Sequence, residues 1–197
     1  MILQLIRHGK TSGNLERRYV GVTDESLCSK GMEELKERTY RPADCIVSSP
    51  MKRCLETAQI IYGFHRPICV CKGLEEMNFG EFEYHNYEEL NHLPSYQAWI
   101  DSGGVMAMPG GESKKDFSQR CVQAFEKQMD DLIKQKNDCI SFIIHGGTIM
   151  AIMEHFGVPQ KNYYDWQIKN GQAFVLEVDP EKWKKGIKKL ILVDRIV

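Results

Sequence analysis

The sequence predicts an α/β fold with a largely parallel central sheet, and two observations support this prediction. Short runs rich in Ile, Val and Leu recur along the chain, and segments with the apolar spacing of helices lie between them. Such alternation of short strands and helices is typical of α/β domains. The 197 residues, 42% of them hydrophobic and 27% charged, suit one globular domain, so we expect a single domain spanning residues 1–197.

The predicted strands are the apolar runs themselves. They cover residues 2–6, 45–48, 68–71, 139–144, 173–178 and 190–193. The segment that joins the last two, residues 179–186, is too short for the crossover that parallel neighbours need. We therefore expect these two strands to be antiparallel.

Helices are predicted between the strands. One begins at Ser29, and Pro50 suits the first turn of another. The longest covers residues 113–136, where apolar residues recur every three or four positions, and a further helix covers residues 147–156. Residues 80–111 lack the alternation of strands, and we expect them to form a helical and loop excursion that covers the active site.

Polar residues cluster where three of the predicted strands end. Arg7-His8-Gly9 follows the first strand, Ser48-Ser49-Pro50 with Arg53 follows the second, and His145-Gly146-Gly147 follows the fourth. Ligands of open α/β sheets bind at the carboxyl ends of strands, so we expect these clusters to meet in one crevice. Two guanidinium groups and the N-terminus of a helix are suited to binding a tetrahedral oxyanion there.

The cluster at His8 has two possible interpretations. Gly9-Lys10-Thr11 could end a nucleotide-binding P-loop, but that motif needs a glycine at the position of Gln4. The alternative is a nucleophile loop, because a neutral imidazole attacks well when a backbone carbonyl fixes its other nitrogen. The remaining histidines have no such neighbours, and we expect them to be structural or exposed: His65, His85, His92 and His155.

Charge and cysteine usage exclude several classes of partner. The net charge of −1 gives no general attraction to nucleic acid, and no run approaches the ~20 apolar residues of a membrane span. No signal peptide is apparent, and the seven scattered cysteines suit reduced thiols in a cytoplasmic protein. No set of residues has metal-ligand spacing, so we expect neither a metal nor another cofactor.

Together, the polar motifs resemble those of the histidine phosphatase superfamily, also called the phosphoglycerate mutase-like family. The matching elements are Arg7-His8-Gly9-x-Thr11-x-x-Asn14, Ser48-Ser49-Pro50-x-x-Arg53-x-x-Glu56-Thr57-Ala58, Glu76-x-x-x-Gly80-x-Phe82-Glu83, Pro109-Gly110-Gly111-Glu112-Ser113 and His145-Gly146-Gly147. Each is weak alone, but their order is specific and they span almost the whole chain. The resemblance implies a three-layer α/β/α sandwich with a mostly parallel central sheet and an antiparallel edge strand.

The resemblance also assigns roles to individual residues. His8 matches the histidine that attacks phosphorus and becomes a phosphohistidine, and Glu76 matches the general acid and base. The residues that would hold the phosphoryl group are Arg7, Asn14, Arg53, His145 and Gly146. Phosphoryl transfer asks mainly for alignment and for stabilisation of oxygen charge, which these groups supply without a metal.

The function implied is a metal-independent phosphomonoesterase, a histidine acid-type phosphatase, acting on a small phosphorylated metabolite. Two alternatives remain, a phosphoglycerate mutase and an inactive module that binds a phosphorylated ligand. Val20 replaces a small hydroxyl residue of the mutases, and most of their insertion before Glu112 is missing, which favours the phosphatase. Residues 80–99 and 109–113, with the segment 117–120, are similar to the α-ribazole phosphatases of cobalamin biosynthesis, which implies α-ribazole 5'-phosphate as a substrate.

Substrate specificity is expected to come from residues 84–111. Tyr87, Tyr96 and Trp99 could flank an aromatic ligand or belong to the core, and the sequence leaves both open. It also leaves open whether the protein is a monomer or a homodimer.

Overall fold

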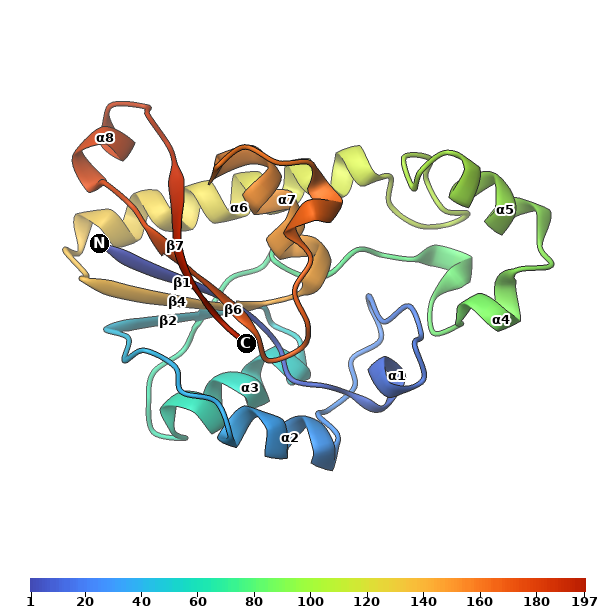
Figure 1. Ribbon diagram of the computed structural model, residues 1–197, viewed down its shortest axis with the longest axis horizontal. Helices are drawn as coiled ribbons and strands as arrows, with labels where there is room; N and C mark the ends of the chain where they lie inside the picture. The colour runs from blue at the N-terminus through green and yellow to red at the C-terminus, as the bar shows by residue number, and fades with distance from the viewer.

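Strand β1 (Ile2–Arg7) lies in the middle of a seven-stranded sheet in this computed structural model, which describes residues 1–197 (Figure 1). The strand order is β3-β2-β4-β1-β6-β7-β5. The other strands are β2 (Cys45–Ser48), β3 (Cys69–Val70), β4 (Cys139–Ile144), β5 (Gly157–Val158), β6 (Ala173–Glu177) and β7 (Leu190–Ile196). Each predicted strand is present, and the α/β fold is confirmed.

The direction of the strands corrects one detail of the prediction. Strands β1 to β4 are parallel, and β6 pairs antiparallel with both β1 and β7, as expected for the last two predicted strands. However, the antiparallel strand is not at the edge: β6 lies inside the sheet, and the edges are β3 and β5. The edge strand β5 has only two residues, too few to give the sequence a recognisable period.

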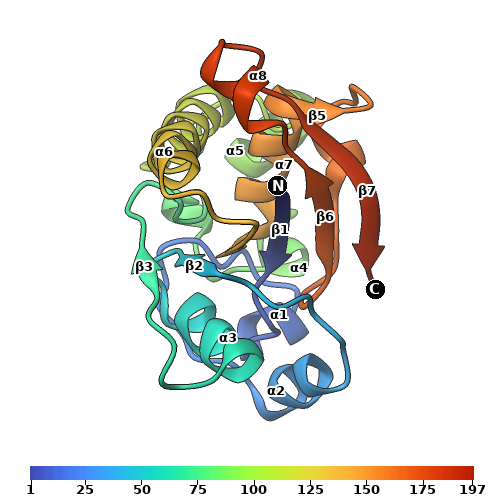
Figure 2. The same ribbon diagram turned by 90° about the vertical axis from the view of Figure 1, so that its left-hand side faces the viewer.

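Helices cover both faces of the sheet and complete the three layers. Helices α2 (Ser29–Lys36) and α3 (Lys52–Tyr62) lie on one face, and α6 (Lys114–Lys134) and α7 (Gly146–Phe156) lie on the other (Figures 1 and 2). Because β1 is covered on both sides, its residues 3–6 are all fully buried. Leu3 and Leu5 pack in the larger core with α6 and α7, whereas Ile6 packs with Ala58 of α3.

The helix boundaries follow local sequence signals. In α6 the predicted apolar stripe is buried, and the hydroxyl of Ser113 caps the helix by accepting the N–H of Asp116 over 3.1 Å. Helix α3 begins at Lys52, two residues after Pro50, and Met51 is its N-cap. Shorter helical elements are α1 (Ser12–Leu15), α8 (Pro180–Lys184) and the 3₁₀ turn η2 (Tyr163–Trp166). No helix of the protein is long and apolar enough to cross a membrane.

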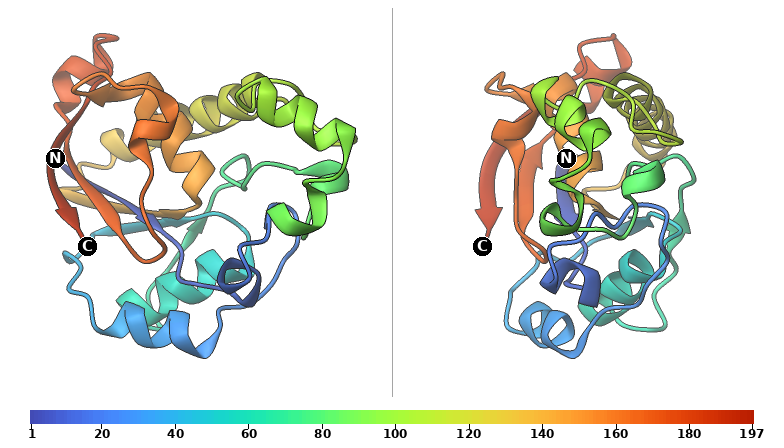
Figure 3. Two further views of the ribbon diagram at one scale, coloured as in Figure 1. Left: turned by 45° about the vertical axis from the view of Figure 1, so that its right-hand side comes forward. Right: turned by 90° about the vertical axis from the view of Figure 1, so that its right-hand side faces the viewer.

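Residues 80–111 form a small helical unit beyond one end of the sheet. It contains the 3₁₀ turn η1 (Gly80–Phe82), α4 (Tyr87–Leu90) and α5 (Pro94–Asp101), and it lies beside α1 (Figure 3). Arg18, just after α1, forms an ion pair with Glu89 of α4 over 2.8 Å. Residues of this unit form a separate hydrophobic core together with Phe117 at the start of α6. This packing fixes the unit near the carboxyl ends of the parallel strands.

Candidate active site

His8 stands directly after β1, and its imidazole is held in one tautomer. Its Nδ1 lies 2.7 Å from the Gly9 carbonyl oxygen, which can only accept, so Nδ1 carries the proton and Nε2 has the free lone pair. The side chain is only 3% exposed. Burial, reinforced by the charges of Arg53 and Arg7, lowers the pKa of His8 well below 6.5. The imidazole is therefore neutral at neutral pH, as a nucleophile must be.

The loop that carries His8 is fixed from two sides. The Gly9 N–H donates to the hydroxyl of Thr57 on α3 over 2.9 Å. From the other side, the Asn170 amide donates to the His8 carbonyl over 3.1 Å and to Asn14 Oδ1 over 3.0 Å. Asn14 in turn accepts the Thr11 N–H and so closes the capping box of α1. These bonds fix the backbone of the loop that carries His8.

Arg53 and His145 form a fully buried pair beside His8. The Arg53 Nε–H donates to His145 Nδ1 over 3.3 Å, so His145 carries its proton on Nε2 and donates it to Ser49 Oγ over 2.8 Å. Burial and the Arg53 charge lower the pKa of His145 well below 6.5. The centroids of the His145 and His8 rings are 5.1 Å apart, edge to face.

Arg7 and Glu76, a basic and an acidic side chain, lie near each other in the site that contains His8. Arg7 Nη1 donates to the Ile168 carbonyl over 2.8 Å, whereas its buried Nε has no hydrogen-bond partner in the protein. The Glu76 carboxylate accepts the N–H of Gly147, at the start of α7, over 2.9 Å, and that of Met77 over 3.0 Å. Burial raises the pKa of Glu76 although these two N–H groups and Arg7 oppose the shift.

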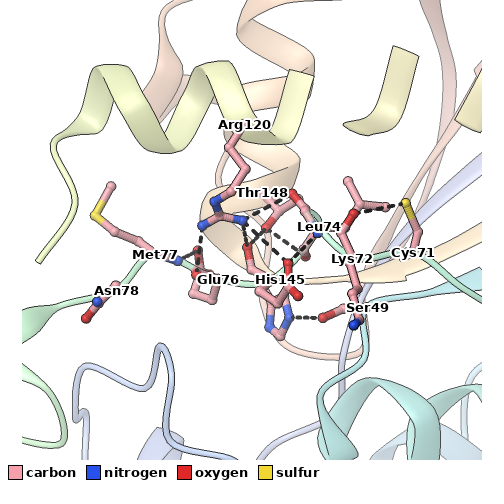
Figure 4. A network of polar contacts seen from close by, with 12 residues as sticks. Ser49, Cys71, Lys72, Leu74, Glu76, Met77, Asn78, Arg120, His145 and Thr148 are labelled. Carbon is pink, nitrogen blue, oxygen red and sulfur yellow. Dashed lines mark hydrogen bonds and ion pairs between the residues drawn. The ribbon is translucent and has the colours of Figure 1, made fainter. Parts of the chain in front are cut away.

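Arg120 of α6 holds the loop that presents Glu76 (Figure 4). Its guanidinium donates to the carbonyl groups of Gly73, Glu75 and Glu76 over 3.1–3.3 Å. It is itself held by the Glu112 carboxylate over 2.7 Å. The Glu75 carboxylate lies 3.7 Å from the same guanidinium and accepts the Gly73 N–H. The structure therefore directs Glu76, and not Glu75, toward His8 and Arg7.

A cavity of about 710 Å³ opens in front of His8. The predicted site residues that line it are Arg7, His8, Asn14, Glu76 and Gly146. Arg53 and His145 are absent from the lining, because both are completely buried. Sequence reasoning thus identified residues that the fold does bring together, five at the cavity surface and two in the polar core next to it.

Aromatic and basic side chains also line the cavity, and the aromatic ones are referred to here as the aromatic wall. The aromatic residues that line it are Tyr19, Phe79, Trp99, Tyr163 and Tyr164, and the basic ones are Lys10, Arg18, Lys114 and Lys169. Of the three aromatic residues considered in the 84–111 segment, only Trp99 faces the cavity. Tyr96 is 1% exposed and belongs to the core, whereas Tyr87 is 62% exposed and does not line the cavity. His65, His85, His92 and His155 are exposed.

Residues 167–170 and 172 were missed by sequence reasoning although they line the cavity beside His8. The segment has neither helical nor strand periodicity and carries no typical catalytic residue. Its place beside His8 follows only from the pairing of β6 with β1 in the folded protein. Because β6 runs antiparallel to β1, with Ala173 opposite Ile6, the loop that enters β6 must lie beside the loop that leaves β1.

No group of three or more His, Cys, Asp or Glu side chains lies close enough together to hold a metal ion. The charge near His8 comes instead from Arg7 and Arg53.

Comparison with known proteins agrees with this geometry. A family model described as "Histidine phosphatase superfamily (branch 1)" matches residues 3–187. The adenosylcobalamin/alpha-ribazole phosphatase of Salmonella typhimurium is 27% identical over 181 residues, which cover 87% of each chain. The 2,3-bisphosphoglycerate-dependent phosphoglycerate mutase of Cytophaga hutchinsonii is 29% identical over 164 residues, covering 78% of this chain and 76% of the mutase.

The fold is also shared with a solved structure. The alpha-ribazole phosphatase from Shigella flexneri superimposes with a TM-score of 0.82 at 23% identity, over 98% of this chain and 95% of that one. The family model matches nearly the whole chain, and both the fold and the histidine cluster at the strand ends agree with that match. The chain belongs to the histidine phosphatase superfamily.

Proposed function

We propose that the protein is a phosphomonoesterase that hydrolyses a small phosphorylated metabolite through a phosphohistidine on His8. The observation that carries the proposal is the pairing of a neutral His8, with its Nε2 lone pair free, and a partly buried Glu76 whose pKa is raised. Both line the same cavity, together with Arg7. A nucleophile, a proton donor and a cation are the groups that phosphoryl transfer requires.

In the first step His8 Nε2 attacks phosphorus, so that an N–P bond forms while the ester P–O bond breaks. Arg7 stabilises the phosphoryl oxygens, assisted by Asn14 and Gly146, which line the same cavity. Arg53 and His145 complete the binding of the phosphoryl group from the buried side. Glu76 gives its proton to the leaving oxygen, which departs as an alcohol.

In the second step water attacks the phosphohistidine. The Glu76 carboxylate takes a proton from the water as the new P–O bond forms, and the N–P bond breaks with its electron pair returning to Nε2. His8 is neutral again and Glu76 is protonated, so the cycle closes with release of inorganic phosphate. No metal is needed, because the arginines supply the positive charge.

The size and lining of the cavity support an organic leaving group larger than glycerate. A volume of about 710 Å³ with aromatic residues in its lining can take a ring system. The Salmonella relative is named an adenosylcobalamin/alpha-ribazole phosphatase. We therefore propose α-ribazole 5'-phosphate as the substrate to test first.

A phosphoglycerate mutase is the second candidate, because mutases are also among the relatives. The two reactions differ only in whether water or a second hydroxyl receives the phosphoryl group from His8. Val20, on the cavity wall, supports the phosphatase because its side chain cannot hydrogen-bond to a glycerate. An inactive binding module is disfavoured, since His8 and Glu76, the proposed nucleophile and proton donor, line the same cavity.

The test combines a substrate panel with trapping of the intermediate. The wild-type protein should release phosphate from α-ribazole 5'-phosphate and form an acid-labile phosphoenzyme, and His8→Ala should do neither. His65→Ala, an exposed histidine, is the matched control and should behave like wild type. With 3-phosphoglycerate and a trace of 2,3-bisphosphoglycerate, formation of 2-phosphoglycerate without free phosphate would instead establish the mutase. Turnover by His8→Ala would remove the proposed nucleophile.

A further inference from the structure

Glu83 lies outside the cavity, and its carboxylate has no role in the proposed reaction. It follows η1, and a single oxygen, Oε1, accepts the N–H groups of Gly21 over 2.8 Å and Thr23 over 2.9 Å. Its other oxygen, Oε2, is buried and has no hydrogen-bond partner. The carboxylate thus binds the backbone of residues 20–23, referred to here as the 20–23 loop.

The same loop binds Arg53 through its carbonyl groups. Arg53 Nη1 donates to the Thr23 carbonyl over 2.7 Å, and Nη2 donates to the Gly21 carbonyl over 2.8 Å. Arg53 is completely buried and forms no ion pair with any carboxylate. The direction of its guanidinium plane is therefore set by the 20–23 loop and, at Nε, by His145.

The 20–23 loop has almost no other freedom. A Cβ at Gly21 would overlap the Met77 carbonyl and would lie 2.8 Å from Glu83 Oε2, so the backbone is packed closely between these groups. At its first residue, Val20, the loop also lines the cavity. A shift of this loop therefore moves Arg53 and the cavity wall together.

We propose that Glu83 is a positioning residue: it fixes the 20–23 loop, whose carbonyl groups aim Arg53 at the phosphoryl group. This inference rests on the proposed function, because it takes Arg53 as a phosphoryl-binding group. Glu83 touches no reacting atom. Its effect is on alignment, and misplacing a binding group by about 1 Å can cost on the order of 100-fold in rate.

The variants to compare are Glu83→Ala, Glu83→Gln and, as the matched control, Glu81→Ala. Glu81 is an exposed carboxylate in the same turn, and its side chain makes no hydrogen bond. Binding of orthovanadate, a phosphate analogue, is measured by calorimetry, and kcat and KM are measured on the best substrate. Glu83→Ala should weaken orthovanadate binding by about 10-fold or more and lower kcat. Glu83→Gln should stay within about threefold of wild type, because an amide oxygen accepts the same two N–H groups.

A double variant separates alignment from a general loss of structure. In an Arg53→Met background, Glu83→Ala should weaken orthovanadate binding by less than about twofold, since two residues that act through one contact are not additive. Additive effects, or undiminished orthovanadate binding by Glu83→Ala, would overturn the inference. If Glu83→Ala does not fold, Glu83→Asp, which draws the carboxylate back by one methylene, should show the same loss of binding.

The outcomes also distinguish this inference from the proposed function. If the wild-type protein binds orthovanadate but hydrolyses no phosphomonoester, the proposed function fails while the role of Glu83 in aligning Arg53 is still measured. If the wild-type protein does not bind orthovanadate, there is no anion site for Arg53 to serve, and the inference fails as well.

Discussion

The Glu76 carboxylate lies against the Cα of Gly147 and accepts the Gly147 N–H over 2.9 Å. The first N–H groups of a helix have no partner within the helix, and here one of them holds the proposed proton donor in place. A side chain at position 147 would overlap Glu76 Oε1. Position 147, the second glycine of His145-Gly146-Gly147, therefore has no side chain because the Glu76 carboxylate occupies that space.

Gly147→Ala should therefore displace Glu76 without harming the helix, because alanine favours helix more than glycine does. We expect kcat on an alkyl phosphate to fall by about 10- to 100-fold, in the range of general acid catalysis. The phosphorylation burst with p-nitrophenyl phosphate should survive, since that leaving group needs no proton. Combined with Glu76→Gln, the alanine should cause no further loss; a full additional loss would mean that Gly147 acts elsewhere.

Glu76→Gln and Glu75→Gln form a second test, of the register of the loop that Arg120 holds. Glu76→Gln should lose most activity on an alkyl phosphate and accumulate phosphohistidine with p-nitrophenyl phosphate, because water then attacks the phosphohistidine without a general base. Glu75→Gln should be close to wild type, since Glu75 does not line the cavity. Quenched-flow measurement of the phosphoenzyme checks both, and the reverse pattern would exchange the roles of the two residues.

The pH dependence follows from two opposite shifts. Burial lowers the pKa of His8, so its neutral form persists as the pH falls well below 6.5. Burial raises the pKa of Glu76, so its protonated form persists above the usual range of a glutamic acid. On an alkyl phosphate, kcat/KM should hence pass through a maximum between the two pKa values. In Glu76→Gln the decline at high pH should disappear, whereas the substrate's own ionisation affects both proteins equally.

Asn170 is predicted to matter although it has no chemistry of its own. Its amide faces the carbonyl oxygens of His8 and Gly9 and the side-chain oxygen of Asn14. Asn170→Asp should be worse than Asn170→Ala, because it aims a carboxylate at three acceptors, whereas alanine only removes donors. We expect kcat/KM to fall by about 10-fold or more in Asn170→Asp, together with a lower Tm. Equal effects of the two substitutions would contradict this account.

Chelation tests the source of the positive charge. Excess EDTA should leave the rate on any accepted substrate unchanged, because the two arginines supply the charge near His8. Abolition of activity by EDTA with recovery on adding a divalent ion would contradict the metal-free mechanism.

Much of the fold and of the site could be predicted from the sequence, because the signals are local. Apolar runs such as residues 139–144 gave the strands, and the rule that ligands bind at strand ends brought His8 and His145 together. The position of β6 inside the sheet could not be predicted, because strand order depends on pairing between distant segments. For the same reason Asn170 was missed: its role exists only once β6 lies beside β1.

The burial of individual side chains could not be predicted from the sequence either. Tyr96 and Trp99 are three residues apart on one short helix, yet one is in the core and the other faces the cavity. Similarly, Arg53 was expected at the surface of the crevice but is fully buried, with its guanidinium directed by backbone carbonyl groups. The direction of Arg53 depends on the distant residues 20–23, and the burial of Tyr96 depends on how residues 80–111 pack against the rest of the chain.

Two kinds of structural element form the cavity, and they differ in how the fold holds them in position. Around His8 the groups are tied to the ends of central strands by hydrogen bonds to backbone, whereas the aromatic wall consists of side chains, among them Trp99 and Tyr164, from segments outside the parallel strands. In a duplicated gene, substitutions in that wall could alter which metabolite is accepted without disturbing the transfer step. Divergence within this lineage should accordingly concentrate in residues 84–108 and 163–169, and exchanging these segments between paralogues should exchange their preferences.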